Sequence, residues 1–233
     1  MFKKLGIGLD AQEKYERAFA KGVLLGDLAG AARLFDEAAR EFAKRGQGEG
    51  ERRALANARL YEYLSTRKAT VLPALIDLLR PLDTIECIGS ATETMSAPGL
   101  VVELEARLAE AEIRAMEGKA SPEAMVALHE RARDRFAALG AGPLVTYAYA
   151  PADGPTQTAE SRAHLHAGHA SWYRAQMHLQ SDPAAAAEEM GRAVASYRLA
   201  GDEAREQHAA RWLADLRLSR TCWVCGREMQ GRG

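Results

Sequence analysis

Three features are scarce or missing in this sequence, and each narrows what the protein can be. The 233 residues include only three cysteines, too few for a disulfide-linked scaffold and consistent with a reducing compartment. Apolar residues never run for the ~18 positions that a membrane-spanning helix needs. The opening MFKKLGIGLDAQ also lacks the apolar run of a signal peptide. We therefore predict a cytoplasmic protein with no membrane partner.

An excess of charge of one sign is also missing. The 31 Lys and Arg residues nearly balance the 32 Asp and Glu residues, which leaves a net charge of −1. Proteins that bind duplex nucleic acid usually carry a basic surplus, so a nucleic-acid partner is not expected. The sequence contains no P-loop, no GxGxxG after a strand, no GxSxG elbow and no kinase motif. These absences predict a non-enzymatic protein without catalytic residues.

What the sequence has in abundance is alanine, together with leucine, glutamate and arginine, and these strong helix formers favour an all-α fold. One pattern occurs three times: alanine, an aromatic residue four positions later, and glycine four positions after that. Residues four apart share a helix face, so the alanine admits a neighbouring helix and the aromatic ring fills the groove beside it. The glycine then ends the helix. The copies are Ala38-Phe42-Gly46, Ala132-Phe136-Gly140 and Ala193-Tyr197-Gly201.

This pattern resembles the second helix of the tetratricopeptide (TPR) repeat, over about residues 10–68 and 100–218. The resemblance implies antiparallel helix pairs stacked as a TPR-like superhelix or solenoid, with a concave surface that holds a peptide or protein partner. The Trp-Leu-Gly-Tyr part of the first-helix motif is poorly kept, and the copies are irregularly spaced. A generic helical bundle therefore remains the alternative.

The expected helices are separated by two irregular insertions, at about 81–98 and 141–158, where Gly, Pro, Ser and Thr cluster. Residues 84–88 alternate in polarity, as a short strand or extended segment does. We assign residues 1–220 to one repeat domain and residues 221–233 to a tail. The helices are expected at 10–26, 28–45, 50–67, 73–80, 99–118, 122–140, 159–180, 183–200 and 202–219.

The tail carries the most specific chemical motif, Cys222-Trp-Val-Cys225-Gly. Two thiolates at this spacing, followed by glycine, resemble the first knuckle of a zinc ribbon and are candidate zinc ligands. A structural zinc site needs four ligands, and this motif supplies only two. Three interpretations stay open: a second knuckle missing from a fragment, ligands from Cys87, a histidine or a second protomer, and a redox or inert pair.

Four histidines lie on the expected helix 159–180. Two of them, His166 and His169, have the spacing of residues that can share a metal ion, but the HExxH motif is absent. A small and apolar stripe on this helix predicts its core face, and the histidines then flank it as groove or surface residues. That stripe consists of Ala163, Ala167, Ala170, Tyr173 and Met177, and the other two histidines are His164 and His178.

Two functions follow from these patterns. The first is a non-enzymatic scaffold or adaptor that binds a protein or peptide in a helical-repeat groove. The second is a zinc-containing regulatory or nucleic-acid-associated module that uses the helices as its platform. The sequence leaves the formation of a homo-oligomer open. The candidate contacts for the first function are Tyr147, Tyr149, His166, His169 and Trp172.

Overall fold

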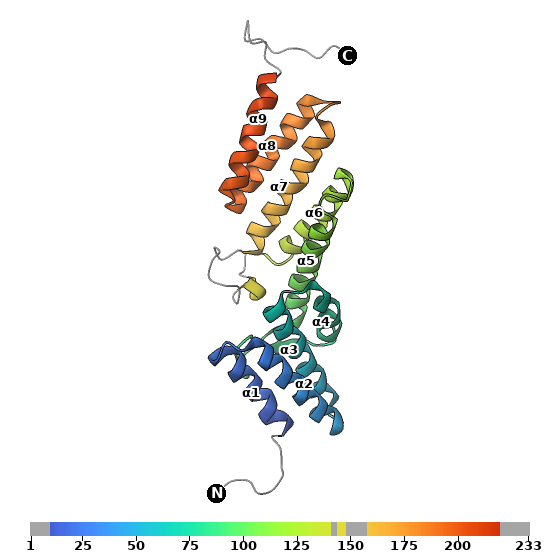
Figure 1. The fold of residues 1–233 in the computed structure, drawn as a ribbon, viewed down its shortest axis with the longest axis vertical. Helices are drawn as coiled ribbons and strands as arrows, with labels where there is room; N and C mark the ends of the chain where they lie inside the picture. Colours follow the sequence, from blue (N-terminus) through green and yellow to red (C-terminus); the bar gives the residue numbers. More distant parts are fainter. Residues whose placement is uncertain (1–9, 141–143, 148–157, 220–233) are drawn as a thin grey trace. The chain divides into compact units, whose positions relative to one another are not determined.

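A computed structural model of the chain describes residues 10–140, 144–147 and 158–219 (Figure 1). Helices dominate these residues, and the only strands among them form one short hairpin, so the all-α fold is confirmed. The chain divides into two compact units. Unit 1 consists of residues 1–105 and 145–153, and unit 2 consists of residues 106–144 and 154–233.

Several helices begin where the sequence predicts, because a short polar side chain caps their free backbone N–H groups. Asp10 accepts from the backbone of Glu13, whose carboxylate accepts in turn from Asp10, which makes a complete capping box. Ser121 and Asp182 each precede a proline at the first helical position and cap the helix that follows. These starts are therefore determined locally.

Unit 1 is built from α1 (Ala11–Leu24), α2 (Leu28–Lys44), α3 (Gly48–Thr66), α4 (Leu72–Leu79) and the part of α5 (Ala97–Met116) that ends at residue 105. The helices α1, α2 and α3 pack in chain order. Their core is aromatic: Phe19 and Phe35 meet edge to face with ring centroids 4.8 Å apart, and Tyr15 lies 5.3 Å from each of them. Such edge contacts add to the apolar burial that stabilises the helix packing.

The first predicted insertion, 81–98, contains a β-hairpin in unit 1. Strands β1 (Thr84–Glu86) and β2 (Thr94–Ser96) pair antiparallel, with Ile85 opposite Met95. Ile85 is fully buried, which anchors the hairpin on the unit. The extended segment expected at 84–88 is thus a strand over its first three residues.

Of the second predicted insertion, 141–158, the structure describes residues 144–147 and 158. The 3₁₀ turn η2 (Val145–Tyr147) belongs to unit 1. The buried carboxylate of Glu103 accepts from the backbone N–H groups of Val145 and Thr146, at 2.8 Å each. These bonds satisfy a carboxylate that would otherwise be costly to bury.

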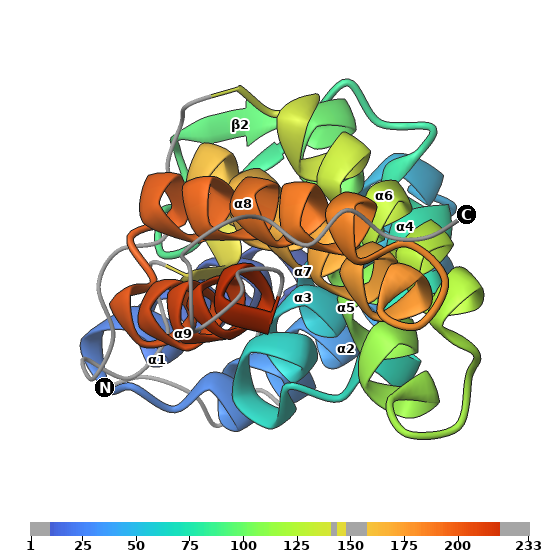
Figure 2. The same ribbon diagram turned by 90° about the horizontal axis from the view of Figure 1, so that it is seen from above.

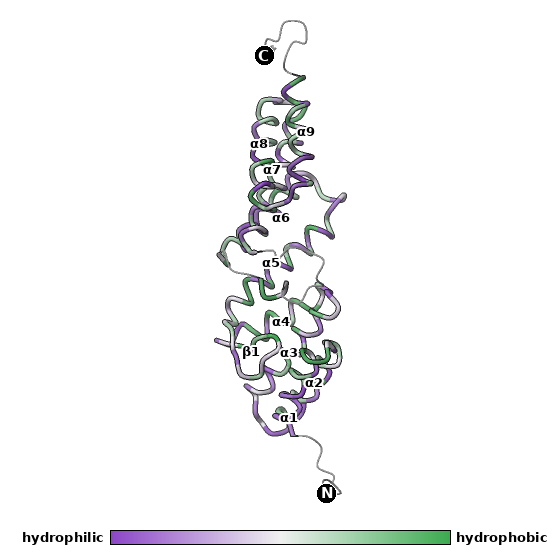
Figure 3. Tube along the Cα trace, turned by 90° about the vertical axis from the view of Figure 1, so that its left-hand side faces the viewer, coloured by the Kyte–Doolittle hydropathy of each residue, from purple (hydrophilic) through white to green (hydrophobic). Residues whose placement is uncertain are grey.

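Unit 2 contains the rest of α5, α6 (Pro122–Ala137), α7 (Ala159–His178), α8 (Pro183–Ala200) and α9 (Glu203–Ser219). The helices α6 to α9 pack successively in chain order, and Figure 2 shows α8 and α9 side by side. Hydrophobic and hydrophilic stretches alternate along the helices of both units, as expected when one face of each helix is buried (Figure 3).

The three repeated sequence patterns adopt the local structure expected of them. The alanines are fully buried, and the aromatic residues are at most 9% exposed. The glycines follow helix ends with φ of +69°, +72° and +72°, a left-handed conformation that glycine adopts without steric cost. The local pattern is confirmed, whereas its assembly into a TPR-like superhelix stays a prediction.

No helix in the described part of the chain has the length and apolar character needed to cross a membrane.

Candidate functional site

A cluster of ionisable side chains lies inside unit 2, among α5, α6 and α7. Glu110 of α5 is its centre and is 6% exposed. Arg107 donates to one carboxylate oxygen of Glu110 at 3.0 Å, and Arg162 lies 3.3 Å from the other. The Nε2 of His166 lies 3.4 Å from that second oxygen. We call Arg107, Glu110, Arg162 and His166 the buried ionic cluster.

The carboxylate of Glu110 is ionised in this cluster. Burial opposes its ionisation, but the His166 hydrogen bond and the charges of Arg162 and Arg107 more than offset that cost and lower its pKa to about 2. A buried charge persists only when it is paired and hydrogen-bonded, and both conditions are met here.

A row of histidines leads from the buried ionic cluster toward the surface. The Nδ1 atoms of His166 and His129 are 3.0 Å apart. Because a carboxylate only accepts, His166 donates to Glu110 through Nε2. The ring of His129 stacks on that of His169, with centroids 4.8 Å apart. The Nδ1 of His169 lies 3.2 Å from the hydroxyl of Tyr197 on α8.

Burial keeps two of these histidines uncharged. It lowers the pKa of His129 to about 3, with smaller contributions from His169 and His166. Burial, followed by the charges of Arg205 and His166, lowers the pKa of His169 to about 4. Both rings are therefore neutral near pH 7 and act as hydrogen-bonding and stacking groups.

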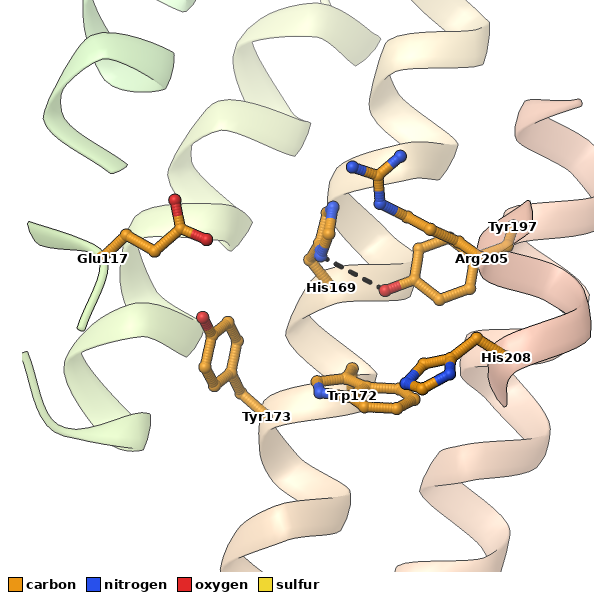
Figure 4. Close-up of a pocket in the computed structure, with 7 residues that line it drawn as sticks. All are labelled: Glu117, His169, Trp172, Tyr173, Tyr197, Arg205 and His208. Atoms are coloured by element: carbon orange, nitrogen blue, oxygen red, sulfur yellow. Dashed lines mark hydrogen bonds between the residues drawn. The ribbon is translucent and has the colours of Figure 1, made fainter. Parts of the chain in front are cut away.

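A pocket opens at the outer end of this row, and His169 forms part of its wall. The cavity has a volume of about 200 Å³. Three of its residues come from α7, one from α8, two from α9 and one from the turn directly after α5, and their side chains face a common space (Figure 4). The lining residues are Glu117, His169, Trp172, Tyr173, Tyr197, Arg205 and His208.

Stacking and hydrogen bonding fix several walls of this pocket. The rings of Trp172 and His208 stack with centroids 5.1 Å apart, and Trp212 lies 5.5 Å from Trp172. The backbone N–H of Arg205 donates to Asp202 at 3.0 Å, and the guanidinium of Arg205 pairs with the same carboxylate. These rings and the paired Arg205 are thus held in place before any ligand arrives.

The structure brings two of the predicted contact residues, His169 and Trp172, to this pocket. His166 was expected in a groove or at the surface but is buried, with 5% exposure, because Glu110 and His129 supply partners for its ring nitrogens. Tyr147 belongs to η2, but its side chain lies outside the described residues, as does Tyr149.

The buried face predicted for α7 needs a correction. Met177 is 39% exposed, Ala163 and Ala167 are partly exposed, and Tyr173 is a pocket wall. The helix packs against both α6 and α8, so its buried surface is wider than one stripe. The residues buried on α7 are Ala159, His166, Gly168, Ala170, Ser171 and Ala175.

Sequence reasoning missed four contributors to the pocket: Glu117, Tyr197, Arg205 and His208. Tyr197 was recognised only as the aromatic residue of a repeat. The other three are ordinary polar residues of helix surfaces or turns, and no motif marks them. Only the packing of the helices of unit 2 brings them to one place.

Metal binding has no support among the residues that the structure describes, because no three His, Cys, Asp or Glu side chains there are arranged to hold an ion. His166 and His169, whose spacing in the sequence would allow a shared ion, direct their Nδ1 atoms to different partners, His129 and Tyr197. Cys222 and Cys225 lie outside the described residues.

Comparisons of the chain with models of protein families, with curated proteins and with solved structures gave no match. Its function is therefore inferred from the side chains that line and support the pocket.

Proposed function

We propose that this chain is a non-enzymatic interaction module built on helical repeats, and that the unit 2 pocket receives part of a protein or peptide partner. The observation that carries this proposal is the composition of the pocket wall. Trp, Tyr and Arg are the residues most enriched at energetic hot spots of protein interfaces, and four of the seven lining residues are of these types.

The size of the pocket also favours a partner's side chain over a small-molecule cofactor. Its volume of about 200 Å³ is below the roughly 300–1,000 Å³ typical of small-molecule sites. A cavity of this size accommodates one anchoring side chain, while the rest of the partner contacts the surrounding helices.

The placement of titratable groups favours recognition over catalysis. Glu110 and His129, whose pKa values are strongly lowered, do not line the pocket. His169 does line it, but its low pKa and its contact with Tyr197 make it a fixed neutral wall. Groups that transfer protons near pH 7 need pKa values close to that pH.

Photo-crosslinking in the native host tests the proposal. Ala204 is exposed on α9 and lies one turn before His208, so a photoreactive residue at this position faces the rim of the pocket. We expect it to capture a defined partner. The matched control is the same residue at Glu188, exposed on α8 outside the pocket lining. Capture at neither position, or equally at both, would contradict the proposal.

The second candidate, a zinc-containing regulatory or nucleic-acid-associated module with the helices as its platform, is supported by one sequence observation. The segment Cys222-Trp-Val-Cys225-Gly has the ligand spacing of half a tetrahedral zinc site. The two functions are compatible, because the described residues that line the pocket include no cysteine.

A further inference from the structure

We infer that the group received by the unit 2 pocket is a basic side chain, lysine or arginine, of a peptide segment in the partner. This inference rests on the proposed interaction function and adds the chemistry of the partner. The observation that carries it is the carboxylate of Glu117, which has no ion-pair partner among the described residues. It lies beside aromatic rings, in a cavity sized for one side chain.

The charged side chains of the pocket wall are not equally available to a ligand. Within the described residues, no hydrogen bond or ion pair engages the exposed carboxylate of Glu117. The nearby Lys119 instead donates to the backbone carbonyl of Ala115 at 3.0 Å. On the other side, the guanidinium of Arg205 is paired with Asp202. The charge left for a partner is therefore negative.

Glu117 and Arg205 also lie on opposite sides of the pocket. Figure 4 shows the Glu117 carboxylate and the Tyr173 hydroxyl directed toward each other, with Arg205 and His208 on the far side. Burial and the charge of Glu117 both raise the pKa of Tyr173, so its phenol is neutral. A cation that enters between them gains a charge-assisted contact to Glu117.

Aromatic surface beside this carboxylate suits a cation on a long aliphatic stem. Tyr173 and Trp172 are consecutive residues of α7, and both rings line the cavity. A lysine or arginine can place its charge near Glu117 and its methylene groups on these rings. Attraction between a cation and the face of an aromatic ring adds roughly 0.5–1 kcal/mol at exposed sites.

An acidic side chain fits the same space less well. Its negative charge would be repelled by Glu117. Arg205 is the one arginine or lysine among the described lining residues, and its guanidinium is already paired with Asp202. His169 offers no positive charge near pH 7, because its pKa is about 4. Charge complementarity therefore selects a basic segment.

Titration of the purified full chain with blocked amino acids tests the inference, with the indole N–H signal of Trp172 followed by NMR. A Trp172→Phe variant assigns that signal. The probes are the N-acetyl amides of lysine, arginine, norleucine and glutamate. We expect the signal to shift with lysine and arginine, and to stay in place with norleucine, which lacks the charge, and with glutamate.

Substitution of the carboxylate gives the decisive comparison. Glu117→Gln should weaken the binding of both basic probes by up to about fivefold, since it removes an exposed charged partner. Glu203→Gln changes another exposed carboxylate of unit 2 outside the pocket and should leave affinity unchanged. Equal shifts with norleucine, a preference for glutamate, or an unaffected Glu117→Gln variant would overturn the inference.

These outcomes are separable from failure of the proposed function. A crosslinked partner at Ala204 together with a preference for glutamate retains the interaction module and rejects the basic ligand. Absence of any shift and of any crosslink rejects both.

Discussion

At the scale of single residues, the stability of unit 2 depends on buried polar groups that compensate one another's charges. Glu110 holds the positive charges of Arg107 and Arg162 inside the protein, and it also accepts from His166. Removing one member of a buried set of charges exposes the others to the full cost of desolvation. Two predictions follow from this dependence.

The first concerns the charge of Glu110. Glu110→Gln leaves the shape nearly unchanged but removes the carboxylate charge between two guanidinium groups, so it should destabilise the protein by about 3–5 kcal/mol. Urea unfolding measures the change. The matched control is Glu112→Gln on the same helix, where an exposed carboxylate pairs with Arg131. That variant should cost at most about 1 kcal/mol. Equal effects of the two variants would contradict a cooperative buried cluster.

The second prediction concerns pH. In the folded protein the pKa values of His129 and His169 are about 3 and 4, below their ordinary value of 6.5. Below pH 6.5 the unfolded chain therefore binds protons that the folded chain does not, and stability falls as pH decreases toward 4. Glu110, whose pKa is lowered to about 2, adds a loss in the same direction below its ordinary value of 4.5.

The free energy of unfolding between pH 7 and pH 4.5 tests this sign. His129→Asn keeps a hydrogen-bonding amide near the position of Nδ1 but cannot titrate in this range, and it should reduce the slope against pH by about half. The control is His164→Gln, which changes a partly exposed histidine of α7, and His129→Asn should reduce the slope more than this control does. A stability that rises on acidification would show that these histidines are not buried in their neutral form.

At the scale of helices, two glycines allow close packing against tyrosines. A Cβ atom on Gly168 of α7 would lie 2.7 Å from the ring of Tyr197 on α8, and one on Gly22 of α1 would lie 2.4 Å from the ring of Tyr61 on α3. These separations are shorter than real contacts, so the missing side chain sets the distance between the helices. Close packing of a glycine against a tyrosine ring thus occurs in both units.

A pair of glycine substitutions tests this packing. Gly168→Ala should destabilise the protein by about 1–3 kcal/mol, since the ring of Tyr197 has to move from its buried position. It should also disturb the adjacent His169, which contacts that tyrosine. Gly191→Ala on α8 meets nothing within 4 Å and should be stabilising by up to about 1 kcal/mol. Urea unfolding of the two variants compares them directly, and changes of the same sign would refute the packing argument.

At the scale of the whole molecule, the zinc hypothesis concerns the tail. Two cysteines provide half of a tetrahedral site. One zinc per chain therefore indicates that the other ligands come from the same chain, and one zinc per two chains indicates that a second protomer supplies them. For the complete natural protein we expect one equivalent of zinc per chain, lost in Cys222→Ser. Elemental analysis measures it, and Cys87→Ser tests whether the cysteine in unit 1 is one of the remaining ligands. Zinc-free protein would reject this function.

The sequence by itself determined the helices and most of their ends. Asp10, Ser121 and Asp182 start helices by capping, and Gly201 ends one in a left-handed conformation. Each of these features depends on residues within about one helical turn, so local chemistry is sufficient to predict it. The buried alanine and aromatic positions followed from the same short-range periodicity.

Only the tertiary structure decided which polar residues are buried and which line the pocket. His166 and His169 are both histidines of α7, yet His166 contacts Glu110 inside unit 2 and His169 forms a pocket wall. Glu117 and Arg205 reach that pocket from distant positions in the sequence. Burial of a polar group depends on partners supplied by other helices, and a pattern along one helix contains no information about them.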